Sequence, residues 1–498
     1  MKDRDRRGII ILAAGLIAGV LSNYLFRAAL GINVFLWILM ILILVAGFAR
    51  FEKITLAGEG RWLALPLLFF AGAFAWRDSI MLQMLDMLLL FLTLGLAAVC
   101  SKSGLLQRTG IVDMVLYLVA GWSRILAGAV SLLFLEIAWQ SLPRGKWLAA
   151  GTAYLRGVLL AVPLILLFGV LFVMADAFFE QLVGRLFAFG LTEALDDLFV
   201  TAFFACVIIG MLYSTFLARD LNLKEFEKWF PPISLGMIEI GTVLGALNIL
   251  FFLFVLVQFR YFFGGEFLLA STGMTYAEYA RRGFFELVAV TALVLPVLLT
   301  AHWLLEKQNP VHERSFRILS GALIAMVFVI MSSAIYRLWL YQSQYGLTEL
   351  RLYAGAFLVW LAIVFLWFLA TVHRGRRDRF AFGALAAGFL IAAALHGINP
   401  DAWIARINVA RFHDNGRFDV DYAVSLSADA VPVLIEALPA LPEEMRAQMA
   451  ASILRQYETP WTTDWRAWNW GRARAWRETR NNRALLEEHA ALAVFPER

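Results

Sequence analysis

The chain has 498 residues, of which 61% are hydrophobic and 16% charged, and its mean hydropathy is +0.73. This is far too much apolar surface for a soluble protein, so the composition indicates a polytopic membrane protein. The net charge of +5 is small for this length and is spread over short loops, which argues against nucleic acid as a partner.

Residue types that build metal or redox sites are sparse. The two cysteines, Cys100 and Cys206, form no CxxC pair, and the six histidines show no HExxH motif or other ligand spacing. The sequence therefore predicts no metal site and no cofactor.

The chain begins with a basic stretch, Met1–Arg7, that leads into the apolar run Gly8–Phe26, which we interpret as an uncleaved first span. Further apolar runs cover about residues 29–49, 62–76, 80–100, 154–174, 198–217, 236–259, 284–305, 316–337, 350–372 and 380–397. The predicted fold is an all-α membrane helix bundle with about 11 to 13 spans.

The region Gly110–Trp139 is ambiguous because Asp113, Arg124 and Glu136 interrupt it and Gly121 divides it into two apolar halves. It is either two short spans or a re-entrant hairpin, and both alternatives return the chain to the side that it left. A single span would invert every later loop. Beyond it, Asp176–Asp197 has the pattern of a helix lying in the membrane interface.

Lys and Arg indicate the orientation of the bundle. If the N-terminus is cytoplasmic, the basic cluster Arg374–Arg379 and most other basic loops are also cytoplasmic, as the positive-inside rule requires. We therefore predict a multi-pass membrane protein with a cytoplasmic N-terminus and a transmembrane domain over 1–397. Residues 398–498 would form a small extracytoplasmic helical domain, with helices starting after a capping Asp429 and at Pro442.

Two stretches combine charge with apolar surroundings. In Thr275–Leu287, Glu278, Arg282 and Glu286 follow one another at i, i+4 and i+8, and Arg281 lies beside them. Glu286 would lie about one turn below the interface, where it needs a partner, and we expect that partner to be Arg337 or Arg351.

The second stretch is Ala334–Tyr353, in which a tight turn joins two spans. Gly346 suits a left-handed C′ position, and Thr348 is placed to cap the next helix. Both stretches face the same side as the C-terminal domain in the predicted orientation. The candidate polar site is therefore Glu278, Arg281, Arg282, Glu286, Arg337, Tyr341, Tyr345, Glu349 and Arg351.

Three separated motifs carry a family resemblance. They are AEYARRGFFEL, YGLTELRLY, and the tail segment NPDAWIARINVARF with DVDYAVSLSADAVPVLIEAL. Over roughly Gly236–Leu438 the chain resembles bacterial polytopic membrane proteins catalogued as a domain of unknown function, the DUF4173/DUF4153-like group. The resemblance implies a multi-span inner-membrane protein and supplies no catalytic residue.

Two classes of function remain. The first is a non-catalytic envelope transporter or sensor-like scaffold, in which Asp86, Asp113, Glu136, Glu239 and Glu286 line a path or pair with arginine. Its partners would be membrane lipid and an extracytoplasmic protein or lipid-linked ligand at the C-terminal domain.

The alternative is a membrane transferase or hydrolase for a lipid-linked envelope substrate, with Glu278 or Glu286 as a base. The sequence contains no paired-carboxylate motif, nucleophile elbow or phosphate loop, which favours the non-catalytic class.

Overall fold

The computed structural model describes residues 3–55, 59–100, 109–137, 192–219, 235–272, 284–305, 310–458 and 464–491, with single positions between 154 and 176. Regular structure in these ranges is helical, and one isolated β-bridge joins Leu235 to Leu305. The predicted interfacial helix Asp176–Asp197 lies mostly outside the described residues, and its last residues belong to a longer helix that begins at Thr192.

Ten helices in the described ranges are long and apolar enough to cross a membrane. They are built on α1 Asp3–Phe26, α2 Ile32–Phe51, α4 Ile80–Cys100, α5 Ile111–Ser131, α8 Thr192–Phe216, α10 Met237–Thr272, α12 Phe284–Leu304, α13 Pro310–Tyr345, α14 Glu349–Thr371 and α15 Phe380–Ile398. A shorter apolar helix, α3 Ala64–Trp76, precedes α4. The chain is a polytopic all-α membrane protein, as predicted.

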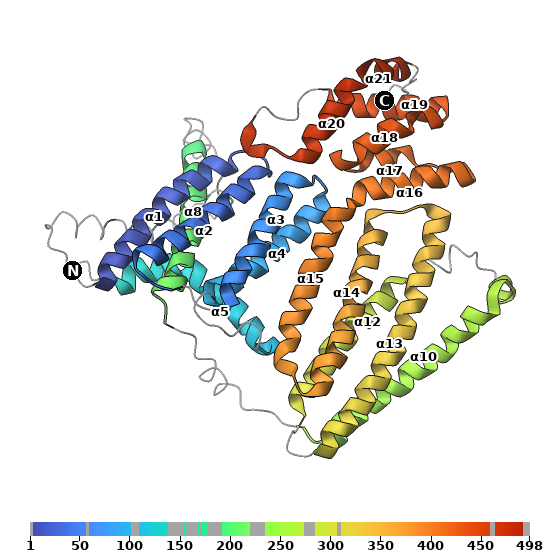
Figure 1. Ribbon diagram of the computed structural model, residues 1–498, viewed down its shortest axis with the longest axis horizontal. Coiled ribbons are helices and arrows are strands. Elements are labelled where there is room, and N and C mark those ends of the chain that lie inside the picture. The colour runs from blue at the N-terminus through green and yellow to red at the C-terminus, as the bar shows by residue number, and fades with distance from the viewer. Residues whose placement is uncertain are drawn as a thin grey trace.

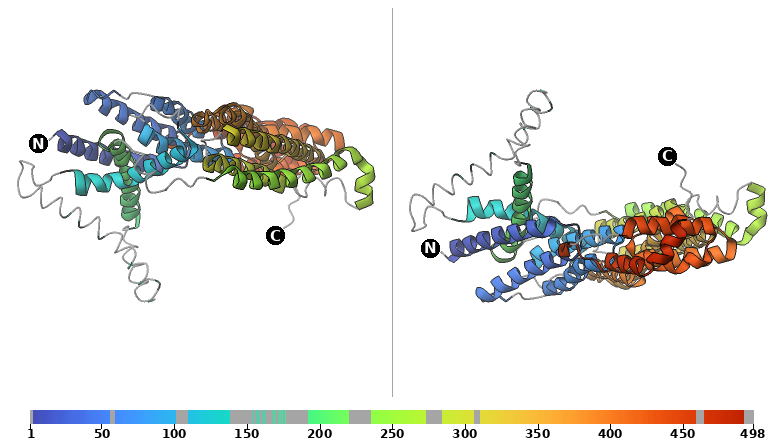
Figure 2. Two further views of the ribbon diagram at one scale, coloured as in Figure 1. Left: turned by 90° about the horizontal axis from the view of Figure 1, so that it is seen from below. Right: turned by 90° about the horizontal axis from the view of Figure 1, so that it is seen from above.

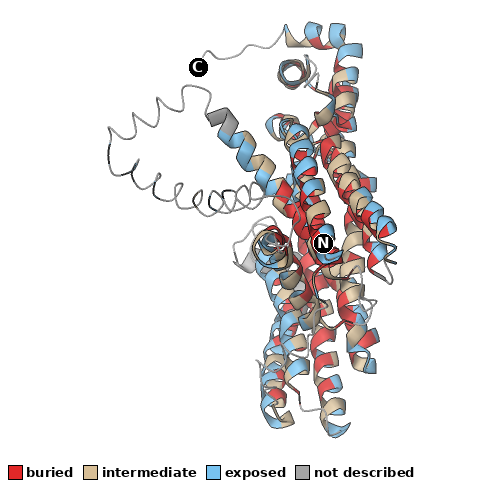
Figure 3. Cartoon of the chain, turned by 90° about the vertical axis from the view of Figure 1, so that its left-hand side faces the viewer, coloured by how far each residue is buried: buried red, intermediate tan, exposed pale blue. Residues whose placement is uncertain are grey.

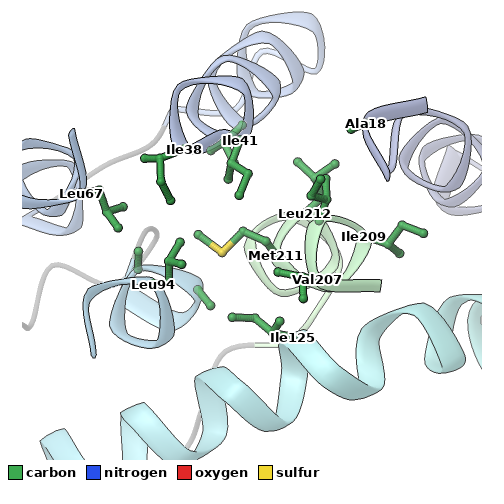
Figure 4. Close-up of a cluster of buried hydrophobic side chains, with 14 of the residues drawn as sticks. Ala18, Ile38, Ile41, Leu67, Leu94, Ile125, Val207, Ile209, Met211 and Leu212 are labelled. Atoms are coloured by element: carbon green, nitrogen blue, oxygen red, sulfur yellow. The ribbon is translucent and has the colours of Figure 1, made fainter. Parts of the chain in front are cut away.

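The membrane helices form two halves, each with its own apolar core (Figure 1). The first half contains α1 to α5 and α8, and its core is shown around Met211 and Leu212 in Figure 4. The second half contains α10, α12, α13 and α14. Helix α15 belongs to both, because Phe380 is part of the second core and Ala392 is part of the first.

The C-terminal helices lie across one end of this bundle (Figure 1). They are α16 Pro400–Asn415, α17 Val420–Ser425, α18 Val431–Ala437, α19 Glu443–Tyr457, α20 Trp470–Asn481 and α21 Arg483–Ala490, and they share a third apolar core. Seen from above, they lie over the second half and reach the edge of the first (Figure 2). We call this the junction end and the opposite end the basic end.

Helix starts in the C-terminal region were predicted with mixed success. Helix α19 begins directly after Pro442, as predicted. The predicted cap at Asp429 is wrong: Asp429 lies inside a 3-10 turn, η8 Ala428–Ala430, and the N-cap residue of α18 is Ala430. The Asp429 carboxylate instead binds the turn between α3 and α4, a long-range contact that a local capping pattern cannot reveal.

Helix α5 corrects the prediction for Gly110–Trp139. The described part of this segment is one helix, Ile111–Ser131, that continues as a π-helical turn, Leu132–Glu136, so it is neither two short spans nor a hairpin. Gly121 does not break the helix; it marks the crossing with α4. A Cβ atom at Gly121 would lie only 1.9 Å from the carbonyl oxygen of Gly95, so the two backbones touch there.

Both ends of α5 lie at the basic end. The helix follows α4, which runs away from the junction, and its last turn reaches the start of α1, where Arg4 pairs with Glu136 at 2.8 Å. In Figure 4, the helix that carries Ile125 runs across the view, whereas those that carry Ile38, Leu94 and Leu212 are seen nearly end-on. The chain thus returns to the side that it left, as both predicted alternatives required.

The outer surfaces of the membrane helices are largely apolar. Exposed positions follow the outer sides of the helices in Figure 3, and they include many large hydrophobic residues, such as Ile17 on α1 and Leu253 on α10. Apolar side chains on the outside and interlocking cores inside are typical of a protein whose solvent is lipid.

Candidate functional site: a buried charge cluster at the junction

The turn between α3 and α4 is bound to two other parts of the chain. The guanidinium of Arg77 donates to the carbonyl oxygen of His396, at the end of α15, from Nε (3.0 Å) and Nη2 (2.8 Å). Arg77 also forms an ion pair of 3.4 Å with Asp429. The backbone N–H of Asp78 donates to the second oxygen of Asp429 at 2.7 Å. The turn therefore joins the membrane bundle to the C-terminal helices.

Helix α20 reaches the same turn from the C-terminal side. Arg472 pairs with Asp78, and its Nη1 donates to the carbonyl oxygen of Leu30 at 3.0 Å. Asn469 caps α20 by accepting from the Arg472 N–H, and its Nδ2 donates to the carbonyl oxygens of Phe74 (2.8 Å) and Arg77 (2.9 Å). These bonds fix the start of α20 to α3 and to the α1–α2 turn.

Asp401, in the first turn of α16, adds a further buried carboxylate. It accepts from the Ser427 N–H at 3.2 Å and from the Ser79 hydroxyl at 3.5 Å. Its carboxyl group also interacts electrostatically with that of Glu349, the first residue of α14. Burial raises the pKa of Asp401, against the lowering effect of its hydrogen bonds from Ser427 and Ser79.

The other acidic groups of the junction are also harder to ionise than in water. Burial raises the pKa of Asp429 to about 6, against the lowering effects of the Asp78 N–H and Arg77. Burial also raises the pKa of Asp78, although Arg472 opposes the shift. Desolvation disfavours the charged form of a carboxyl group, and here the nearby arginines offset only part of that cost.

A histidine–aspartate pair lies beneath these groups, inside the membrane helices. His396 Nε2 and Asp86 Oδ1 are 2.8 Å apart, and the two side chains are 0% and 1% exposed. The His396 ring stacks on Trp76, with centroids 6.2 Å apart. Within the described ranges, the remaining polar atoms of the pair, Asp86 Oδ2 and His396 Nδ1, have no hydrogen-bond partner.

We define the junction cluster as Arg77, Asp78, Ser79, Asp86, Glu349, His396, Asp401, Asp429 and Arg472. Its five carboxyl groups outnumber its two arginines, and burial raises the pKa of Asp78, Asp401 and Asp429 above the ordinary value. No group of three or more His, Cys, Asp or Glu residues in the described ranges has the geometry of a metal site.

Comparison with known proteins places the chain in a family. A family model described as "Domain of unknown function (DUF4153)" matches residues 64–437. The chain belongs to this family. No curated protein and no solved structure matches the chain. The match confirms the resemblance seen in the sequence and extends it toward the N-terminus to include α3 and α4. In this DUF4153 protein, the junction cluster lies within the matched residues except for Arg472.

The structure describes only part of the acidic and basic ladder predicted before α12. Glu278, Arg281 and Arg282 lie outside the described residues. Glu286 lies on the exposed side of the first turn of α12, and no ion pair within the described ranges joins it to Arg337 or Arg351. The predicted pair is therefore wrong.

The reason lies in how α13 is rotated. Arg337 is 7% exposed and faces the second core, where it donates to Gln258 Oε1 of α10 at 3.0 Å. The Ser333 hydroxyl donates to the same oxygen at 2.8 Å.

The tight turn after α13 forms largely as predicted. Gly346 has φ +81°, the left-handed value expected of a C′ residue. The Tyr341 and Tyr345 rings lie 5.0 Å apart, and the Arg351 guanidinium lies 3.9 Å from the Tyr341 ring centroid. Thr348 is at the N-cap position of α14, but its side chain makes no capping bond.

The hydroxyl of Tyr422 replaces the missing cap by accepting from the Glu349 N–H at 2.9 Å. Glu349 is thus the predicted site residue that reaches the junction cluster. A ligand site at this turn stays a prediction.

Sequence reasoning missed most of the junction cluster. It singled out Asp86 as a buried polar residue, but it gave no role to Asp78, Asp401 or His396. The available signals were weak: the tetrapeptide WRDS between two apolar runs, and the NPD sequence directly after α15. Each is also an ordinary loop pattern, so the sequence alone does not bring them together.

Proposed function

We propose that this DUF4153 protein is a non-catalytic sensor or scaffold of the bacterial cell envelope. The observation that carries the proposal is the junction cluster, which ties the C-terminal helices to both halves of the membrane bundle at one end. The first half contributes Arg77, Asp78, Ser79 and Asp86, the second half Glu349, the shared helix α15 His396, and the C-terminal helices Asp401, Asp429 and Arg472.

This arrangement argues for a scaffold over a rocking transporter. Alternating access requires the two halves to part at each end of the bundle in turn. Parting at the junction end would break the bonds of Asp429 to the α3–α4 turn and the pair of Arg472 with Asp78. Breaking one buried ion pair costs on the order of 3 to 5 kcal/mol, so such a motion would be rare without a strong driving ligand.

Charge supports an extracytoplasmic position for the C-terminal helices. Many basic residues lie at helix termini or connections remote from the junction, including Arg4, Arg6, Arg7, Arg50, Arg317, Arg374, Arg376, Arg377 and Arg379. The positive-inside rule assigns that end to the cytoplasm. The exposed Tyr345 and the C-terminal helices would then face an extracytoplasmic protein or lipid-linked ligand.

The coupling can be tested by distance measurements between spin labels. Leu21 on α1 and Ser343 on α13 are exposed and lie near the junction end of each half. After Cys100 and Cys206 are replaced by alanine, Leu21→Cys and Ser343→Cys carry the labels in full-length protein in lipid nanodiscs. We expect one narrow distance distribution, which broadens when Arg472→Ala is added.

Two exchanging distances in the otherwise unaltered protein would contradict a scaffold and favour a transporter. A separate test concerns sidedness. Alkaline phosphatase fused to the C-terminus should be active, whereas an inactive enzyme together with a fluorescent cytoplasmic reporter would place the C-terminal helices inside the cell.

A further inference from the structure

Three arginines gather at the junction end of the second half, where α16 lies over the turn between α13 and α14 (Figure 1). Arg351 lies in the first turn of α14, Arg411 near the C-terminal end of α16, and Arg417 in the loop between α16 and α17. Asn408 of α16 holds the turn in place, because it accepts from the Leu347 N–H at 2.8 Å and donates to the Leu347 carbonyl oxygen at 2.9 Å. We call the three residues the arginine cluster.

Two members of the arginine cluster approach the same residue, Gly346. The Nη1 atom of Arg351 donates to the Gly346 carbonyl oxygen, while its guanidinium lies over the Tyr341 ring. A Cβ atom at Gly346 would overlap Arg411 Nη1 and would lie 3.4 Å from Arg411 Cζ. The two guanidinium groups therefore flank the backbone of one residue.

The loop after α16 brings Arg417 to the same place. This loop turns back at a left-handed glycine, with φ +68°, and Phe418 then packs against Phe412 with ring centroids 6.2 Å apart. Arg411 and Arg417 each directly precede one of these rings. Burial and the charges of Arg417 and Arg351 lower the pKa of Arg411, as expected when like charges lie close together.

The charge of the arginine cluster is not compensated by carboxylates. No carboxylate in the described ranges forms an ion pair with any of its members. Two of the acidic residues nearby in the sequence have other partners: Asp419 accepts from the Tyr422 N–H at 2.9 Å, and it thereby caps α17. Glu349 interacts with Asp401. Asp414, the third, is exposed to solvent.

A purely structural role explains one arginine only. The bond of Arg351 to the Gly346 carbonyl oxygen stabilises the C-terminal end of α13, where a cation is favourable. A helix terminus carries about half of an elementary charge, so at least two of the three positive charges remain. Arg411 Nε is buried and has no hydrogen-bond partner among the described residues. Arg417 is exposed, and its bond to this part of the chain comes from its backbone N–H.

We propose that the arginine cluster binds the phosphate group of a ligand, with Arg411 and Arg417 as the main donors. A phosphate group presents three or more acceptor oxygens, whereas a carboxylate presents two. Planar guanidinium groups bind phosphate oxygens in a bidentate manner, so several of them around one group give both affinity and geometric selection.

The position of the cluster suits two sources of phosphate. The turn joins two membrane spans, so it lies at the level of lipid headgroups, and the flanking Tyr345 and Leu350 are 56% and 54% exposed. A phospholipid headgroup and a soluble phosphorylated molecule share the chemistry that the arginines recognise. The side of the membrane on which the ligand is found rests on the proposed function, but the site itself does not.

The first experiment measures lipid retention by the purified full-length protein with native mass spectrometry. The probes are phosphatidic acid and diacylglycerol with the same acyl chains, which differ only in the phosphate group. The wild type should retain phosphatidic acid preferentially. Arg411→Gln/Arg417→Gln should bind it about tenfold more weakly or worse, since the variant loses two charge-assisted hydrogen-bond donors. Arg411→Lys/Arg417→Lys should keep most of the preference.

The matched control is Arg455→Gln/Arg474→Gln, which removes the same charge from exposed positions on α19 and α20. It should change the affinity for phosphatidic acid less than twofold. Thermal unfolding without ligand shows whether each variant is folded. If Arg411→Gln/Arg417→Gln is not folded, Arg417→Glu alone decides, because Arg417 is exposed and its side chain forms no bond with the described residues.

A second experiment identifies the source of the phosphate. Inorganic phosphate is added to lipid-free protein, and the unfolding temperature is compared with that in sodium chloride of equal ionic strength. Stabilisation that is lost in the Gln variant, without a preference for phosphatidic acid, would support the site and assign it to a soluble ligand.

The proposal is overturned if the wild type responds to neither probe. It is also overturned if the Gln variant, or Arg417→Glu in its place, retains phosphatidic acid and responds to inorganic phosphate as the control variant does. Spin-label distances can contradict a scaffold while these binding assays succeed, and the reverse, so the two proposals fail separately.

Discussion

Arg472→Ala should loosen the C-terminal helices from the membrane bundle. The guanidinium of Arg472 is 12% exposed and the carboxylate of Asp78 16%, so the substitution leaves a largely buried charge without this arginine. Removing one member of a buried pair typically costs on the order of 3 to 5 kcal/mol. The lost bond to the Leu30 carbonyl adds roughly 1 kcal/mol.

A double variant separates the stranded charge from the lost contacts. Asp78→Asn removes the charge and keeps the side-chain shape, so Arg472→Ala/Asp78→Asn should recover about half of the loss or more. Thermal unfolding in detergent gives the order of stability. Limited proteolysis should show earlier release of the C-terminal helices in the single variant than in the double variant.

The control for this experiment lies on the same helix. Arg474 is exposed on α20, and Arg474→Ala should change stability by less than about 0.5 kcal/mol. If Arg472→Ala and Arg474→Ala unfold at the same temperature and release the C-terminal helices equally fast, then the ion pair with Asp78 does not hold the junction and the reasoning fails.

Two further predictions concern pH and helix crossing. Because the pKa of Asp429 is about 6 in the folded protein and 3.8 in the reference state, folding takes up a proton between these values, and stability should rise as pH falls from 7 to 5. The gain for this group is about 1.3 kcal/mol between pH 7 and pH 5, and Asp429→Asn should remove it in pH-dependent thermal scans. Gly210→Ala would place a Cβ 1.8 Å from the Ile125 carbonyl oxygen and should lower stability by about 1 to 3 kcal/mol or more, whereas Gly245→Ala, with no atom within 4 Å, should be nearly neutral in the same scans.

The membrane helices could be predicted from the sequence because a span needs about 20 consecutive apolar residues, a requirement that is local. The turn at Gly346 was predictable for the same reason, since a left-handed residue after a helix favours glycine. Gly121 misled the prediction because its small size serves a contact with Gly95, which is distant in the sequence. A glycine inside an apolar run can mark either a break or a close crossing, and the local pattern is the same.

The candidate site was harder to predict, because pairing depends on how each helix is rotated about its axis. The spacing of Glu278, Arg282 and Glu286 defines a helix face, but it does not say what that face meets. Arg337 donates to Gln258 and does not contact Glu286. Asp429 binds the loop between α3 and α4 and does not cap its own helix. The junction cluster draws its residues from five separate stretches of the chain, and each stretch taken alone resembles an ordinary loop or helix end.

The shared helix α15 sets the order in which the protein can be completed during synthesis. The first half ends near residue 217, but its core includes Ala392, and Asp86 meets His396 only when α15 has been inserted. The ion pairs of Arg77 with Asp429 and of Asp78 with Arg472 form only after the C-terminal helices have been synthesised. A chain that ends before α15, which begins at Phe380, therefore has a first half whose core lacks Ala392 and whose buried Asp86 lacks His396. Such a product presents a target that a membrane protease can distinguish from the finished protein.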